Sequence, residues 1–151
     1  MIRTILVALD DSPRAPSVFA TAAEIADRFS ATLRLLRVVD MPPEFPAAAH
    51  SGVDSLAAVL DKRARAELSA LAGAHPRARI EPTMFAAGDP ARAIIEASDE
   101  LDVDMIVLGS HGYRGLDVIL GTTAAKVANQ ATRSVLIVHA RPDRDSGGGA
   151  P

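Results

Sequence analysis

The sequence predicts an α/β fold in which helices cover both faces of one mostly parallel sheet. Five short apolar runs of strand length alternate with segments that have a helical period. The fourth run, residues 103–108, shows little alternation between apolar and polar residues, as expected for a strand that is covered on both faces. With 151 residues, 48% of them hydrophobic, the chain can bury one sizeable core. We therefore predict a single domain over residues 1–140 and a flexible tail over residues 141–151.

The first unit of the chain is a strand followed by a helix. Residues 2–9 are rich in leucine and β-branched residues and stop at two aspartates. Ser12 is a candidate N-cap, and Pro13 would be tolerated in the first turn of a helix that runs to about Phe29. Residues 32–39 then predict the second strand.

The middle of the chain begins with a predicted surface loop over residues 40–53, which hold three prolines and no period. Asp54 is a candidate N-cap for a helix that ends near Gly73. One face of this helix is apolar and consists of Leu56, Val59, Leu60, Leu68 and Leu71. Residues 79–86 predict the third strand.

The last part of the chain repeats the alternation. Gly88 provides a turn, Asp89 a candidate N-cap and Pro90 a first helical residue, for a helix that runs to about residue 100. The fourth strand, the last helix and the fifth strand are predicted over residues 103–108, 122–130 and 134–138. Five strands with intervening helices require a mostly parallel sheet with right-handed crossovers.

Composition excludes several function classes. The net charge is −3 and the basic residues are scattered, so no basic stripe is available for a nucleic-acid backbone. The chain has no cysteine, which excludes disulfides and thiolate chemistry and is consistent with a reducing compartment. The first apolar run is too short for a signal peptide or a membrane span. We therefore expect a cytoplasmic protein with no nucleic-acid or membrane partner.

One strand end is dense in glycine. Four glycines fall within thirteen residues between the fourth strand and the last helix: Gly109, Gly112, Gly115 and Gly121. Glycines allow positive φ and a close approach to an anion, and a helix start offers unpaired N–H groups, here beside the hydroxyls of Thr122 and Thr123. This combination predicts a phosphate site.

The glycine segment does not match the best-known phosphate motifs. The residues from Gly121 to Lys126 lack the P-loop pattern, and the first strand–helix turn lacks the dinucleotide fingerprint. Ser110 directly follows a glycine, so Ser110 and His111 do not form a nucleophile elbow. The other histidines are isolated and have no metal-ligand spacing. We therefore predict no catalytic residue and no protein metal site.

The run from Gly109 to Gly112, followed after a spacer by Gly121 and Thr122, resembles the nucleotide motif of ATP-binding universal stress proteins. The opening run 5–12, the second strand end 38–40 and the closing run 134–138 are also similar to that family. The resemblance covers roughly residues 2–140. One departure is the spacer 113–120, which has eight residues where the family motif has nine.

The resemblance implies a Rossmann-like sheet of the adenine nucleotide alpha hydrolase type with strand order 3-2-1-4-5. It implies that Asp10 accepts hydrogen bonds from a ribose, that the backbone of Val38 meets the adenine edge, and that Ala8 and Leu9 line the base pocket. The residues implied to hold ribose and phosphates are Gly109, Ser110, His111, Gly112, Gly121, Thr122 and Thr123. It also implies a homodimer built on the fifth strand.

The function that follows is an ATP-binding stress-response or signalling protein, with Mg²⁺ or Mn²⁺ left open as a companion of the nucleotide. A slow ATPase is an alternative, although no residue stands out as a base that would orient water. A phosphoacceptor receiver domain also ends its first strand in aspartates. It requires an aspartate after the third strand and a lysine after the fifth, where this chain has Ala86-Ala87 and His139. An FMN-binding, flavodoxin-like domain is the remaining alternative.

Overall fold

The computed structural model describes residues 1–39, 50–110 and 120–139. Most of the predicted loop and the predicted tail therefore lie outside the described residues. The elements are β1 (Thr4–Leu9), α1 (Ala15–Phe29), β2 (Thr32–Val39), α2 (His50–Gly73), β3 (Arg79–Ala87), α3 (Pro90–Glu100), β4 (Met105–Gly109), α4 (Thr122–Gln130) and β5 (Ser134–Val138).

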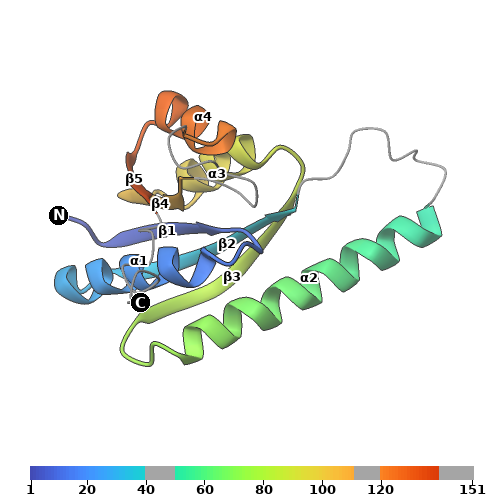
Figure 1. Ribbon diagram of the computed structural model, residues 1–151, viewed down its shortest axis with the longest axis horizontal. Coiled ribbons are helices and arrows are strands. Elements are labelled where there is room, and N and C mark those ends of the chain that lie inside the picture. Colours follow the sequence, from blue (N-terminus) through green and yellow to red (C-terminus); the bar gives the residue numbers. More distant parts are fainter. Residues whose placement is uncertain (40–49, 111–119, 140–151) are drawn as a thin grey trace, which may run out of the picture.

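The five strands form one parallel sheet in the order β3-β2-β1-β4-β5 (Figure 1). Helices α1 and α2 cover one face, and α3 and α4 cover the other (Figure 1). The predicted fold class and the strand order are thus confirmed. This order differs from the 2-1-3-4-5 order of receiver and flavodoxin-like domains, so the sheet excludes both of those alternatives.

The core has two layers because successive strand residues point to opposite faces of the sheet. In β1, Ile5, Val7 and Leu9 are buried towards α1, whose Phe19 is fully buried among them. Leu6 lies on the other face, in the cluster formed with α3 and α4. Nearly continuous apolar strands are what a sheet that is covered on both faces requires.

The predicted start of α1 was wrong by two residues. Ser12 and Pro13 lie in a turn, and the helix begins at Ala15 with Pro16 in its first turn. The hydroxyl of Ser12 accepts the Arg14 N–H at 3.3 Å, and the Ser12 carbonyl accepts the Ala15 N–H at 3.1 Å. The serine therefore stabilises the turn before the helix instead of capping the helix itself.

The predicted start of α2 was also wrong, because the helix begins at His50 and not after Asp54. The last proline of the preceding segment is Pro46. Residues 50–53 therefore contain no proline that would interrupt the helix. For α3 the prediction is confirmed: Asp89 is the N-cap and Pro90 the first helical residue, although the Asp89 side chain makes no capping bond. Gly88 has φ +121°, a conformation that favours glycine.

Candidate functional site

The candidate site lies at the carboxyl edge of the sheet, where the strand order changes direction. The chain proceeds from β1 to β2 and β3 on one side, and then returns to β4 on the other side of β1. Ligands of open parallel sheets bind in the crevice at such a switch point. The described site residues come from the ends of β1, β2 and β4 and from the start of α4.

Asp10 follows the last residue of β1 and is exposed. Its Oδ1 accepts the Ser12 N–H at 3.0 Å, which holds the carboxylate in a local turn. Its Oδ2 accepts no hydrogen bond from the described residues. Since Leu9 pairs with Arg37 and Ala8 with Leu108, Asp10 lies one residue further along, beside Val38 and near Ser110.

The residues predicted to line the base pocket divide between the two faces of the sheet. Ala8 and Val38 are half-buried on the face covered by α3 and α4. Leu9 is only 4% exposed and is packed on the opposite face, against α1. A ligand on the α3 and α4 side would therefore meet the side chains of Ala8 and Val38, and would meet Leu9 only through its backbone.

The start of α4 reaches the same edge of the sheet. Gly109 ends β4 opposite Val138, and the buried Ser110 follows it. The Ser110 carbonyl accepts the Gly121 N–H at 2.7 Å, so the residue before α4 lies directly against the end of β4. Thr122 is exposed and Thr123 is half-buried in the first turn.

Gly121 is the N-cap of α4 and has φ −58° and ψ 154°, which any residue can adopt. Positive φ is therefore not the reason for a glycine at this position. The predicted residues His111 and Gly112 lie outside the described residues, as does most of the spacer. Sequence reasoning did not identify the Ser110–Gly121 bond, because it joins two backbone groups that leave no signal in residue types.

Charge at the site is sparse. The end of β1 contributes two exposed aspartates, Asp10 and Asp11, and Lys126 is exposed one turn into α4. In the described residues, no group of three or more histidines, cysteines, aspartates or glutamates could hold a metal ion. Within the same part of the chain, no helix is long and apolar enough to cross a membrane.

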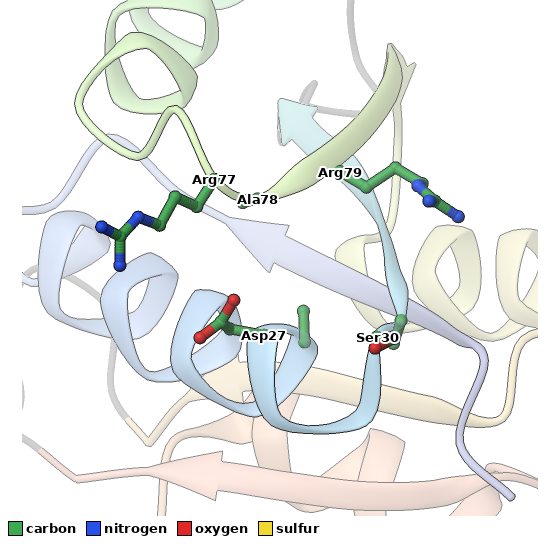
Figure 2. A pocket seen from close by; sticks show the side chains of 7 residues that line it. Asp27, Ser30, Arg77, Ala78 and Arg79 are labelled. Carbon is green, nitrogen blue, oxygen red and sulfur yellow. The ribbon is translucent and has the colours of Figure 1, made fainter.

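A separate shallow cavity of about 170 Å³ lies at the opposite, amino-terminal edge of the sheet (Figure 2). The end of α1 contributes Asp27 and Ser30, and the segment that leads into β3 contributes Arg77 and Arg79. The two arginine side chains point away from each other (Figure 2). None of the predicted site residues lines this cavity, so it does not belong to the candidate site.

Comparisons with known proteins agree with the fold and with the family resemblance. Residues 1–139 match the model of the universal stress protein family. The chain is 34% identical to universal stress protein A homolog 1 of Coxiella burnetii, over 89% of this chain and 94% of that protein. The solved structure of the universal stress protein UspA from Lactobacillus plantarum is 26% identical, with a TM-score of 0.75, over 91% of this chain and 97% of that one.

A further solved structure, of a universal stress protein in complex with cAMP, is also 26% identical. Its TM-score is 0.65, and the alignment covers 91% of this chain and 97% of that one. The family model spans almost the whole sequence, and the first relative is similar over nearly its full length. This chain therefore belongs to the universal stress protein family.

Proposed function

We propose that this protein binds ATP at the carboxyl edge of β1, β2 and β4 and acts as a nucleotide-dependent stress-response or signalling protein. The observation that carries the proposal is the meeting of Asp10, the Gly109–Ser110 end of β4 and the start of α4 at the switch point of the sheet. A carboxylate that can accept hydrogen bonds from sugar hydroxyls and N–H groups that can donate to an anion thus lie at the same edge of the sheet.

Ribose and base would bind on the β1 and β2 side of this edge. The Asp10 carboxylate is exposed, and the Ser12 N–H already orients one of its oxygens. The other oxygen can therefore accept a ribose hydroxyl with little further loss of side-chain conformational entropy. The small side chain of Ala8 leaves room for an adenine above the sheet, and Val38 supplies an apolar contact and backbone groups. The solved structure of a related universal stress protein in complex with cAMP, an adenine nucleotide, supports an adenine nucleotide as the ligand class.

The phosphates would bind on the β4 and α4 side. The first turn of α4 offers N–H groups without helical partners and a partial positive charge, and the hydroxyls of Thr122 and Thr123 lie in the same turn. ATP, as opposed to a monophosphate, is proposed on the resemblance of the glycine motif. A Mg²⁺ or Mn²⁺ ion would take most of its ligands from phosphate oxygens, because the described residues supply no cluster for it.

Calorimetry with nucleotide-free, folded protein tests the proposal. We expect ATP to bind with a Kd in the micromolar range, equivalent to about 7–8 kcal/mol. FMN should produce no comparable heat. A flat ATP titration up to millimolar concentration would refute the proposal, and FMN bound more tightly than ATP would indicate a flavin site instead. Mass analysis of small molecules released from freshly purified protein provides an independent check.

A further inference from the structure

Ser110 lies where β4, β5 and α4 meet, and its two backbone groups bond to both of the other elements. Its N–H donates to the carbonyl of Val138, the last residue of β5, at 2.9 Å. Its carbonyl accepts the Gly121 N–H at 2.7 Å. Ser110 is only 2% exposed, so water competes little for either bond. One residue therefore connects the end of the sheet to the residue that starts α4.

The bond from Gly121 attaches the start of α4 to the end of β4. The carbonyl of Gly121 accepts the Ala125 N–H at 2.9 Å, which is the first hydrogen bond of the helix. With its N–H held by Ser110 and its carbonyl engaged in α4, Gly121 is held on both sides. These two hydrogen bonds of Gly121 orient the first turn of α4, and with it the N–H groups that have no partner within the helix.

We infer that Ser110 is the positioning residue of the phosphate site, acting through its backbone on Gly121; the inference rests on the proposed ATP binding. The separation between the end of β4 and the start of α4 is then set by this hydrogen bond and not by the length of the spacer between them. This accounts for a spacer of eight residues where the family motif has nine. A residue can be lost from the spacer without displacing the start of α4 from the end of β4.

The test removes the donor at Gly121. Proline adopts a φ near −58°, so Gly121→Pro fits the observed backbone but has no N–H to donate to Ser110. Gly121→Ala is the matched control, because it adds a Cβ and keeps the N–H. We expect calorimetry to show ATP affinity at least about fivefold weaker for Gly121→Pro than for Gly121→Ala, since the Ser110 carbonyl loses its donor.

Two further measurements separate positioning from a general loss of structure. Adenosine, which lacks phosphates, should bind Gly121→Pro as it binds the wild type. One glycine inserted after Asp117, which is not among the glycines of the predicted phosphate site, gives a nine-residue spacer and should change ATP affinity by less than threefold. This insertion variant tests the inference even if Gly121→Pro does not fold.

Three results would overturn the inference: equal ATP affinity for the proline and alanine variants, a matching loss of adenosine affinity, or an insertion as damaging as the proline. A wild type that binds no ATP would instead refute the proposed function, and the positioning role with it.

Discussion

Asp10 is the residue whose placement most directly links the fold to the proposed ligand. It stands at the end of β1, and its Oδ1 is oriented by the N–H of Ser12. Its carboxylate is suited to sugar hydroxyls and would repel phosphate oxygens at close range. A ligand should therefore place its ribose at Asp10 and its phosphates further towards α4.

Replacing Asp10 by asparagine tests this division of roles. An uncharged amide is a weaker acceptor for a hydroxyl, so Asp10→Asn should weaken ATP binding by up to about tenfold. Inorganic triphosphate has no ribose, and its affinity should not decrease. Asp11→Asn is the matched control, because Asp11 is the adjacent exposed aspartate and has no proposed contact. Equal losses for ATP and triphosphate in Asp10→Asn would contradict the ribose assignment.

Asp104 illustrates a single residue with a purely structural role. Its Oδ2 accepts the N–H groups of Arg3 at 2.7 Å and Thr4 at 2.9 Å, which attaches the start of β1 to the start of β4. The hydrogen bonds from the Arg3 and Thr4 backbone hold the pKa of the Asp104 carboxyl below its usual range. The ionised form is thus favoured in the folded protein.

The stability that Asp104 contributes should depend on pH. A lowered folded-state pKa means that the contribution is present above the ordinary carboxyl pKa and is lost as the pH falls through the folded-state value. Asp104→Asn should lower the free energy of unfolding at pH 7 by no more than about 1 kcal/mol, because the group is exposed to solvent. Urea titrations should show this difference shrinking towards pH 3. A difference that does not change with pH would exclude the proposed origin.

Among the elements, α2 forms an ion pair with β2 that the sequence alone does not predict. Arg37 of β2 lies under the helix with a side chain only 8% exposed, and its Nη2 is 3.0 Å from the Glu67 Oε2. Arg63 binds the other oxygen of Glu67 at 2.9 Å. The pKa of Glu67 is held below its usual range, chiefly by the hydrogen bond from Arg63 and also by Arg37. The buried Nε of Arg37 has no hydrogen-bond partner among the described residues.

This pair should respond asymmetrically to mutation. Glu67→Gln leaves a buried arginine charge uncompensated and should lower the free energy of unfolding by about 1–3 kcal/mol, less than for a fully buried pair because Glu67 is 37% exposed. Arg37→Met removes both the charge and the unpartnered Nε and should leave stability unchanged or slightly higher. Urea denaturation measures both variants.

Glu24→Gln on α1 is the control for the Arg37 pair, because its pair with Arg28 is exposed on both sides. We expect it to change the free energy of unfolding by less than about 0.5 kcal/mol. A loss of stability in Arg37→Met as large as that in Glu67→Gln would contradict the interpretation, since it would show that the pair itself is strongly favourable.

At the scale of the whole molecule, β5 lies at one edge of the sheet next to β4. The Val138 carbonyl accepts the Ser110 N–H, so the backbone groups of Val138 face β4. By strand alternation, those of Ile137 face the open edge. Ile137 is half-buried against the α3 and α4 layer. Among the described residues no strand pairs with the outer side of β5, so this side offers backbone groups without a strand partner.

We therefore predict a homodimer in which β5 pairs with β5 of a second copy around a twofold axis. Ile137→Pro removes an N–H that faces the partner and should shift the dimer towards monomer. Ile137→Ala keeps that N–H and is the matched control. Light scattering after size exclusion measures the mass of each variant. A wild type that is monomeric at high micromolar concentration, or a proline variant that dimerises as well as the alanine variant, would refute the pairing.

Local sequence patterns were sufficient to predict the five strands, the four helices and the glycine-rich strand end. A strand or helix is largely specified by the apolar period and the breakers within it. The first strand was predicted two residues too long, the fourth was predicted to begin two residues too early, and the starts of α1 and α2 were misplaced. In α1 the reason is a turn built by Asp10 and Ser12, whose competition with the helix cannot be judged from capping preferences alone.

The sequence by itself thus determined the type of each element and the residue types available at each strand end. The strand order was predicted only from the family resemblance. The tertiary structure decided that Leu9 faces α1 while Ala8 faces the candidate site, that Arg37 is buried under α2, and that Ser110 holds Gly121. These features depend on register and on backbone bonds between residues far apart in the chain, and such non-local contacts leave no periodic trace in the sequence.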